Sequence, residues 1–481
     1  MIAYVLALTI VSAGAPVDQA PAQPPQQAQK PAKEKKPKKD KKEKKAKKEK
    51  PAPDLPDDAT DEPDPQVVLP PPAQGKGFEW EQHPGIRFGK HFNIEFEAKL
   101  QEDYHTSYAG AEQVAGLEDW ELHRNRIGVL GNVGKHIEFE VEHEFTEHEL
   151  SEKDIEAGVT PKSQWKDVRA NFDYIKNAQI QVGKFKIPFG LDQTTGVTHN
   201  DFVYRSLGAI YLSPGRDIGV MVHGRFFKRG LNYWVGGFEH DGDNAKSKKI
   251  EGGDQTFAGR VTFRPLRGVA PAFDLMEFGV NAALTSLSDD NFRPNGLRGR
   301  TVVSQDTFYE PVYVKGHRTR TGADLDWTIG PASVRGEFDQ VLDTRDGQGI
   351  DNATLPDARY RSWFVSGTYL LTGEHKARPV KADNDFITGG GIGAIEIAAR
   401  MERLFFDSVE TNGGPVFATP RTLNIQPSGD KLFTIGVNWT LNRFLKIQFD
   451  VIHEQVEGTY RNPIPDGSAF WNKALRLQIV L

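Results

Sequence analysis

Arginine, lysine and carboxylate side chains recur at every second position along many short segments of this 481-residue chain. Residues 137–142 read Ile-Glu-Phe-Glu-Val-Glu, and residues 445–450 read Leu-Lys-Ile-Gln-Phe-Asp. Period two predicts an extended strand, because successive side chains leave a strand on opposite faces. One face of each strand is then apolar and the other is charged. Charged faces act on ions through the field that they create, and guanidinium groups bind oxyanions through paired hydrogen bonds.

Basic residues on these faces, together with Lys184, Lys186 and Arg216 at the two ends of the segment 188–215, are the candidates for lining a pore and contacting anions. They are Arg124, Arg126, Arg169, Lys184, Lys186, Arg216, Arg225, Arg260, Arg264, Arg318, Arg320, Arg335, Arg400, Lys446 and Arg476. The same faces carry carboxylates, among them a column formed by Glu138, Glu140, Glu142 and Glu144. Opposite charges on adjacent strands pair by default, so an ion pair within the wall is the competing interpretation for each arginine. We expect ion pairs from Arg124 and Arg126 in particular.

Catalytic and metal chemistry finds little support in the residues. The chain contains no Cys, which excludes disulfides, thiolate metal sites and Cys nucleophiles. His143 to His148 has the spacing HExxxH rather than the HExxH of a zinc helix, and it lies at a predicted strand end. The glycines of 389–393 lack the spacing of a dinucleotide-binding loop. We therefore expect no enzymatic activity, no cofactor and no metal site.

Sixteen segments with strand periodicity must position the charged side chains. They lie near 86–100, 119–131, 135–146, 166–175, 178–187, 216–227, 231–240, 254–265, 274–287, 318–329, 332–345, 359–372, 393–405, 430–441, 444–456 and 470–481. Their length suits strands that cross a bilayer at a tilt. On the lipid face of a barrel an Arg or Lys near the midplane costs about 2–4 kcal/mol, so the charged faces must line water. With a mean hydropathy of −0.53, the chain offers no apolar run long enough for a membrane helix.

Short turns alternate with long polar loops, such as 101–118, 188–215 and 288–317, between the predicted strands, as they do in outer-membrane barrels. One connection breaks this rule: 373–392 should be short, so either it folds into the lumen or the strand count slips there. The loop at 188–215 carries apolar residues that would narrow the pore if they packed on the inner wall, whereas the alternative places them on the outer rim. Just before this loop the alternation falters at Gly183, which predicts a β-bulge that re-aims Lys184 and Lys186.

The N-terminal part of the chain differs in composition from the rest, and this difference predicts three regions. Residues 1–15 resemble a secretory signal peptide, 16–77 form a disordered linker that is first Pro/Lys-rich and then Pro/Asp-rich, and 78–481 form the barrel. The lysines of Lys30–Lys50 could bind an anionic envelope polymer, and a solvated spacer is an equally good interpretation. With secretion expected, nucleic acid is not a predicted partner.

Several motifs resemble the phosphate-selective porin O and P family. They are Gly183–Gly190 (GKFKIPFG), Pro214–Gly219 (PGRDIG), Gly336–Asp339 (GEFD) and Gly393–Arg403 (GAIEIAARMER). The resemblance covers roughly residues 86–481, and Lys184, Lys186 and Arg216 fall on its motif positions. It implies a 16-stranded outer-membrane barrel, commonly trimeric, with an inward-folded third loop. It also implies a basic lumen through which phosphate or other anions diffuse without turnover.

Together these observations predict an all-β protein: a 16-stranded antiparallel transmembrane β-barrel behind a disordered Lys/Pro-rich segment. The expected function is diffusion of small anions, phosphate or polyphosphate among them, across the outer membrane of a Gram-negative-type bacterium, with the N-terminal tail in the periplasm. Three alternatives stay open. A general porin of weak selectivity is favoured by the interleaved carboxylates, a barrel that tethers the envelope through Lys30–Lys50 is favoured by the basic tail, and a soluble β-sandwich would also alternate.

Overall fold

The computed structural model describes residues 76–80, 83–89, 92–109, 117–146, 164–243, 255–288, 294–387, 389–409, 416–417, 419–458 and 466–481. The chain divides into two compact units, residues 1–55 and 56–481, and every described residue belongs to the second. The predicted signal peptide, the Lys30–Lys50 segment and all but the last two residues of the predicted linker lie outside the described residues. Within the described part, no helix is long and apolar enough to cross a membrane.

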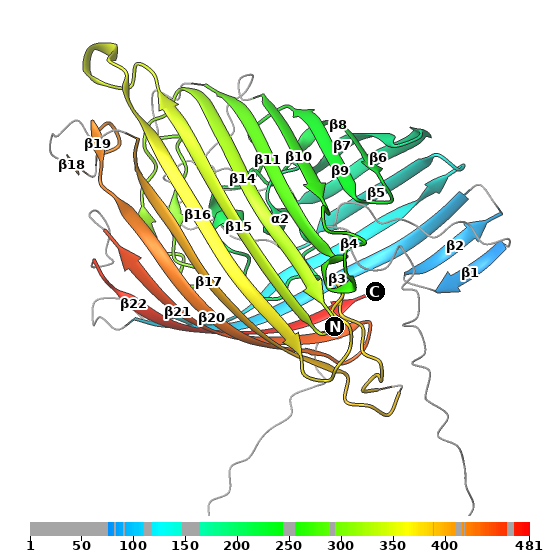
Figure 1. Ribbon diagram of the computed structural model, residues 1–481. Helices are drawn as coiled ribbons and strands as arrows, with labels where there is room; N and C mark the ends of the chain where they lie inside the picture. The colour runs from blue at the N-terminus through cyan, green and yellow to red at the C-terminus, as the bar shows by residue number, and fades with distance from the viewer. Residues whose placement is uncertain are drawn as a thin grey trace, which may run out of the picture. The chain divides into compact units, whose positions relative to one another are not determined.

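Sixteen antiparallel strands form a closed barrel in chain order (Figure 1). They are β3 (Phe92–Ala109), β4 (Leu117–Val133), β5 (Ile137–Glu144), β6 (Trp165–Ile175), β7 (Ala178–Lys186), β8 (Arg216–Phe226), β9 (Leu231–Phe238), β10 (Thr256–Phe263), β11 (Met276–Leu287), β14 (Gly316–Ile329), β15 (Ala332–Arg345), β16 (Leu355–Leu370), β17 (Ala394–Ser408), β20 (Ser428–Thr440), β21 (Leu445–Glu457) and β22 (Ala469–Val480). The barrel closes where β22 pairs with β3, from Phe470 opposite Ala109 to Val480 opposite Lys99. The predicted barrel and its strand count are confirmed.

The predicted first strand has wrong bounds. In place of one strand over 86–100, β2 (Pro84–Phe88) ends before β3 begins, and β3 runs on through half of the predicted loop 101–118. A strand absent from the prediction, β1 (Lys76–Trp80), pairs with β2. β2 in turn pairs with the first residues of β3, since β22 reaches only to Lys99 and leaves that part of the edge open.

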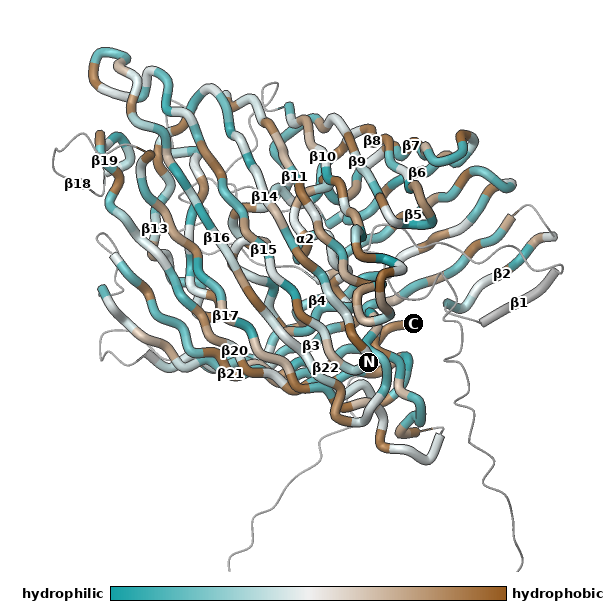
Figure 2. Tube along the Cα trace, in the orientation of Figure 1, coloured by the Kyte–Doolittle hydropathy of each residue, from teal (hydrophilic) through white to brown (hydrophobic). Residues whose placement is uncertain are grey.

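The two faces of the strands meet different surroundings, as the period of two predicts. Along β16 and β20 the outward Val365 and Ile435 are 54% and 53% exposed. On the inward face of β14, by contrast, Arg318 and Arg320 are 1% and 0% exposed. The tube in Figure 2 accordingly changes between hydrophobic and hydrophilic colours along each strand. Apolar side chains therefore cover most of the outer surface of the barrel, and most charged side chains of the strands point into its interior.

Residues 188–215, here called the inner loop, connect β7 to β8 and contain the short helices α2 (Leu191–Thr194) and α3 (Leu207–Tyr211). Its apolar side chains are buried, with Leu207 1% and Leu212 0% exposed. Leu207, Tyr211 and Leu212 pack in one cluster with inward residues of the wall such as Tyr360 and Phe406. These contacts favour packing against the inner wall over the outer-rim alternative.

A second connection joins the same apolar cluster. The segment between β11 and β14 contains β12 (Gly299–Arg300) and β13 (Thr307–Tyr309), and its Val302, Phe308 and Val312 are buried beside the inner loop's residues. The prediction of a long connection here is correct, but the expected polar character is wrong for these residues. Four minor elements lie in other connections of the described chain: η1 (Pro271–Phe273), η2 (Ile350–Asn352), and the parallel pair β18 (Val416–Phe417) and β19 (Asn424–Ile425).

Part of the long connection between β16 and β17, which broke the rule of short turns, turns into the barrel around Glu374 and Lys376. The ammonium of Lys376 lies 2.6 Å from an Asp201 carboxylate oxygen of the inner loop and also contacts Glu396 of β17. The Lys376 side chain is 0% exposed. Of the two explanations offered by the sequence, the lumen is therefore right and the strand count holds.

Candidate functional site

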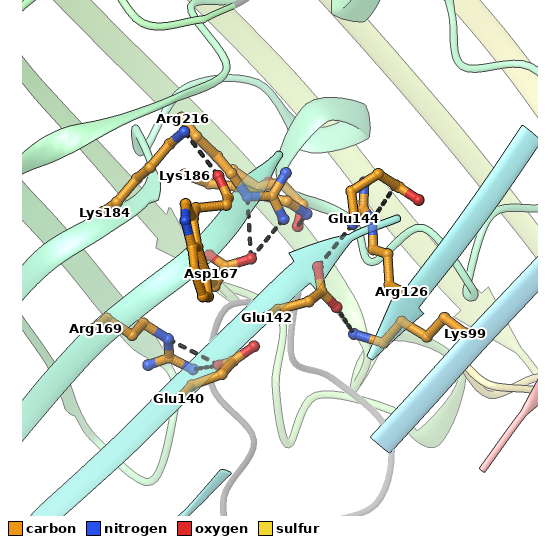
Figure 3. A network of polar contacts seen from close by, with 12 residues as sticks. Lys99, Arg126, Glu140, Glu142, Glu144, Asp167, Arg169, Lys184, Lys186 and Arg216 are labelled. Atoms are coloured by element: carbon orange, nitrogen blue, oxygen red, sulfur yellow. Dashed lines mark hydrogen bonds and ion pairs between the residues drawn. The ribbon is translucent and has the colours of Figure 1, made fainter. Parts of the chain in front are cut away.

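The acidic column of β5 pairs with basic groups of the neighbouring strands, as expected (Figure 3). Arg126 of β4 donates to Glu142 at 2.9 Å and to Glu144 at 2.7 Å. Arg169 of β6 donates to Glu140 through two nitrogens, at 3.0 and 2.6 Å. The glutamates of β5 thus pair with arginines on both neighbouring strands, which neutralises much of the field that each arginine alone would create.

Lys99 and Arg124 complete this part of the wall. The Lys99 ammonium lies 3.1 Å from Glu97 and 2.7 Å from Glu142, and it was missed among the candidates. Its signal was available, because Lys99 follows Glu97 at strand spacing within a predicted strand. Arg124 contacts Gln101 and lies 3.8 Å from Glu144, so the predicted ion pair is looser here than at Arg126.

Arg216 and Lys186 reach into the barrel from the two ends of the inner loop. The Arg216 guanidinium donates to one oxygen of Asp167 at 3.0 and 2.7 Å (Figure 3). Lys186 donates to the carbonyl oxygens of Thr194 at 3.1 Å and of Thr195 at 3.0 Å. Lys186 therefore fixes the first turn of the inner loop, whereas Arg216 belongs to the charged wall.

The predicted bulge at Gly183 is wrong. Pairing continues without a shift through Val182, Gly183 and Lys184, on both the β6 and the β8 side. What breaks the alternation is the backbone, since Gly183 has a φ of +117° and a Cβ there would lie 2.2 Å from the Val168 carbonyl oxygen. Lys184 shares its register with Val168 and donates to the Trp165 carbonyl at 2.8 Å. Its cross-strand neighbours Val168 and Ile218 belong to the exposed apolar face, so Lys184 lies outside the paired column of β5.

The arginines of β10 and β14 are committed to buried carboxylates. Arg260 binds Asp324 through two bonds, at 2.6 and 2.9 Å. Arg318 binds Asp343, and both Arg318 and Arg320 donate to Asp241, which follows β9 and was missed because nothing in its local sequence marks it. Two other candidates lie near the short turns. Arg264 donates to Glu277 at 3.0 Å, and Arg225 shares its face of β8 with the buried His223.

The remaining candidates hold the inner loop by its backbone. Arg320 donates to the Leu212 carbonyl at 2.8 Å, Arg400 to Tyr204 at 3.0 Å, Lys446 to Asn200 at 2.8 Å and Arg476 to Val203 at 2.7 Å, while Arg335 donates to the Thr195 hydroxyl at 2.6 Å. Arg476 also binds Asp103 through two bonds, at 2.7 and 2.6 Å. Buried carbonyl groups need such donors, because an unpaired one costs free energy comparable to a lost hydrogen bond.

Carboxylates of the wall accept the inner loop's N–H groups in the same way. Both oxygens of Glu337 accept from the start of α2, at 2.9 Å each. Glu402 accepts from the Leu207 amide at 2.6 Å, and Asp450 accepts from the Val203 amide at 2.8 Å. Charged groups of both signs thus join the wall to the inner loop. The sequence pattern predicts that both signs occur in the lumen, but it does not predict that they bind the loop.

Asp201 ties the inner loop to the connection between β16 and β17. Its carboxylate accepts from Lys376 at 2.6 Å and from Arg378 at 3.2 Å. Burial raises the pKa of Asp201, but the charges of Lys376 and Arg378 outweigh that effect and hold its pKa below the ordinary value. Asp201 therefore stays ionised at neutral pH despite its burial.

Arg205 is the cation that the inner loop itself contributes, and it was missed because it lies outside any strand pattern. One of its terminal nitrogens donates to the Thr195 carbonyl at 2.6 Å, and the other, Nη1, has no hydrogen-bond partner among the described residues. Burial lowers the pKa of Arg205 to about 10; Asp192 opposes this shift, whereas Arg216, Arg335 and Arg126 add to it. Arg205 thus stays protonated at pH 7 where guanidinium groups of several strands converge.

One group of side chains has the composition of a metal site. Potential ligand atoms of Asp103, Glu121 and His123 lie within 4.8 Å of one another. Asp103 already accepts two hydrogen bonds from Arg476, and His123 lies 2.9 Å from Glu121. These contacts explain the group as part of the wall's polar network, which is the simpler interpretation.

Comparison with known proteins gives the fold and the site a context. The family model of the phosphate-selective porins O and P matches residues 94–479. Porin O of Pseudomonas aeruginosa is 24% identical over 379 residues, which cover 68% of this chain and 80% of that protein.

Solved structures resemble the barrel at low sequence identity. The outer membrane channel DcaP of Acinetobacter baumannii is 9% identical with a TM-score of 0.50, covering 82% of this chain and 99% of that one. The anion-selective porin from Comamonas acidovorans is 11% identical with a TM-score of 0.47, covering 81% of this chain and 100% of that one. Identities this low speak only to the fold. The family match spans most of the barrel, so this chain belongs to the phosphate-selective porin O and P family of outer-membrane channels.

Proposed function

We propose that the barrel passes small anions, phosphate among them, by diffusion through a water-filled lumen that the inner loop narrows. The observation that carries the proposal is Arg205, a partly exposed guanidinium that the inner loop brings among basic groups of the wall. Its neighbours Arg126 and Arg216 come from the wall. A phosphate oxygen suits such a donor, because guanidinium groups bind oxyanions through paired, charge-assisted hydrogen bonds.

The narrowing is supported by how firmly the inner loop is held. Basic groups of β14, β15, β17, β21 and β22 donate to it, while its Arg205 is near Arg126 and Arg216 of β4 and β8. On this proposal, solutes pass between the inner loop and the strands β3 to β8. Some of the fifteen candidates bind the inner loop or other buried groups, whereas others lie on the wall that faces Arg205. Those we propose to act on solutes are Arg124, Arg126, Arg169 and Arg216, joined by Lys99 and Arg205.

A weakly selective channel is the second candidate function, and the carboxylates of the same wall favour it. Glu140, Glu142 and Asp167 each bind a basic group there. A ring of one sign selects ions strongly, whereas a mixed ring lets the two charges offset each other. The preference of the pore for anions or cations is set by the charges that have no full counter-charge. On this proposal Arg205 is the group that favours anions.

Reversal potentials in planar bilayers test the proposal. In a potassium chloride gradient the sign of the potential should be that of an anion-selective pore, and added phosphate should reduce the chloride current as it occupies the same groups. A potential of the opposite sign would refute anion selectivity and leave the weakly selective or cation-selective pore. The homotrimer, which rests on the family resemblance, is tested by the mass of the detergent-solubilised protein.

A further inference from the structure

The outside of the barrel carries a basic cluster that the channel function does not use. Arg359 and Arg361 of β16, Arg403 of β17 and Lys431 of β20, here called the outer basic patch, share the strand faces of exposed apolar residues. Their side chains are 28%, 35%, 36% and 40% exposed. These three strands are consecutive in the sheet, and β21 follows them. The patch residues lie at the strand ends that carry the long loops (Figure 1).

Two carboxylates serve all four cations. Asp407 accepts two bonds from Arg359, at 2.9 and 2.7 Å, and a third from Arg361 at 2.8 Å. Glu457 accepts from Arg403 at 2.9 Å and also contacts Lys431. A further carboxylate, Asp357, precedes Arg359 on the same face of β16. Four positive groups against three negative ones leave the patch basic.

The arrangement holds like charges close together. Arg403 and Lys431 are direct cross-strand neighbours, a destabilising pairing of like charges, and Glu457 is the one carboxylate that both of them contact. Arg361 and Arg403 both lie over the ring of Phe405, 5.4 and 4.9 Å from its centre. The Nε atoms of Arg361 and Arg403 are buried without a hydrogen-bond partner among the described residues. Because these two atoms are buried, a ligand would meet only the exposed ends of the four cations, whose positive charge exceeds the negative charge of the nearby carboxylates.

The depth of the patch identifies its surroundings. Farther along the same faces, Val365, Met401 and Phe433 lie in adjacent register and are 54%, 53% and 47% exposed, as befits contact with hydrocarbon. Trp363 is the cross-strand neighbour of Arg403, at the border between the two zones. Tryptophan and basic residues beside an apolar belt mark the level of lipid headgroups. The outward faces of β3 and β4 carry Glu102 and Glu118 instead, so the basic character is local.

We propose that the outer basic patch binds the phosphorylated headgroup of a lipid in the leaflet on the long-loop side. A phosphate group accepts several charge-assisted hydrogen bonds and bears a charge that offsets the excess of the patch. The acyl chains of the same molecule would lie on the adjacent apolar faces. A free phosphate ion offers the charge without that apolar contact, and the lipid is therefore the favoured occupant.

Retention of lipopolysaccharide by the purified full-length barrel tests this inference. The protein in detergent is mixed with lipopolysaccharide, separated from free lipid, and its bound phosphorylated lipid is counted by native mass spectrometry. The wild type should retain the lipid, and Arg361→Gln/Arg403→Gln should reduce retention at least tenfold. The matched control Lys135→Gln/Lys176→Gln removes the same charge from exposed turns at the opposite rim and should leave retention unchanged.

Further arms separate the sources of phosphate and the effect of folding. Millimolar inorganic phosphate should not displace the lipid, and dephosphorylated lipopolysaccharide should be retained poorly. Arg361→Lys/Arg403→Lys keeps the charge and should restore part of the retention, and heat-modifiable migration on gels reports folding of every variant. Equal retention by the wild type and Arg361→Gln/Arg403→Gln overturns the proposal, as does displacement by inorganic phosphate, which would indicate a small-ion site.

Discussion

The inner wall of the barrel has two sides that use the same residue types differently. On β14 to β22, Arg320, Arg400 and Arg476 are buried and give hydrogen bonds to the backbone of the inner loop. On β4 to β8, Arg126 and Arg216 bind carboxylates of the wall and face the loop's own cation, Arg205. These three arginines on the first side therefore hold the loop in place, whereas the two on the second side contribute to the field in the lumen.

The comparison also gives a reason for so many charges in one barrel. A loop folded inside a protein brings buried N–H and C=O groups that must be satisfied. Here the wall supplies both kinds of partner: Glu337, Glu402 and Asp450 accept, while Arg320 and Lys446 donate. Removing such groups should cost stability, whereas removing a group on the other side should change permeation.

The largest effect should follow from Asp241→Asn, which removes the carboxylate shared by Arg318 and Arg320. Breaking a buried ion pair by deleting one partner costs about 3–5 kcal/mol, because the remaining charge stays buried. We expect a loss of that size in the free energy of unfolding, measured by guanidinium titration of the barrel in lipid vesicles.

Asp351→Asn is the matched control, since Asp351 is exposed in the connection between β15 and β16 and asparagine tolerates its φ of +55°. Its free energy of unfolding should equal that of the wild type. An equally stable Asp241→Asn barrel would contradict the structural role of the loop-bearing side.

Asp201→Asn should have the next largest effect, about 3 kcal/mol, since Lys376 and Arg378 lose a buried anion. The pKa of Asp201 is held below its ordinary value, so its contribution is complete above about pH 4, the value for an unfolded aspartate. That contribution is lost only as the pH falls through the lower pKa of the folded state.

Unfolding titrations at several pH values check this sign. The difference between wild type and Asp201→Asn should be constant from pH 5 to pH 8 and should shrink only in stronger acid. A difference that fades between pH 8 and pH 6 would mean that Asp201 is protonated in the folded protein near neutral pH.

Arg205→Glu tests the role of the second side of the wall in ion permeation. Reversing this charge should lower the anion-to-cation permeability ratio about fivefold, equivalent to roughly 1 kcal/mol, because the group adjoins Arg126 and Arg216. Reversal potentials in a salt gradient measure the ratio. Arg361→Glu makes the same charge change on the outside of the barrel and should leave the ratio unaltered; an equal response from both variants would remove Arg205 from the proposed selectivity.

Glu142→Gln should have the smallest effect and the opposite direction. Lys99 and Arg126 would each keep a second carboxylate, Glu97 and Glu144, so the barrel should remain folded. One negative charge fewer in the lumen should raise the anion-to-cation ratio about twofold in the same recordings. Glu457→Gln on the outer surface is the control, and a lower ratio for Glu142→Gln would show that this wall does not act through its net charge.

Much of the wall could be predicted from alternation alone. All sixteen barrel strands and the inward side of residues such as Arg126 and Arg169 follow from the period of two. The errors fall where the chain leaves that period: the break between β2 and β3, the unshifted pairing at Gly183, and Asp241 and Arg205 in connections. A connection has no repeating geometry, so its side chains can be placed only by what they touch.

Sequence by itself determined which solvent each side of a strand meets, because a charged side chain against hydrocarbon is too costly and the pleat sends neighbours to opposite faces. It could not decide which cations remain available to solutes. That depends on partners far apart in the chain, such as Arg476 with Asp103 and Lys376 with Asp201. Closure of the barrel and folding of the inner loop bring these groups within hydrogen-bond reach, and only then is each charge either neutralised or left to act on an ion.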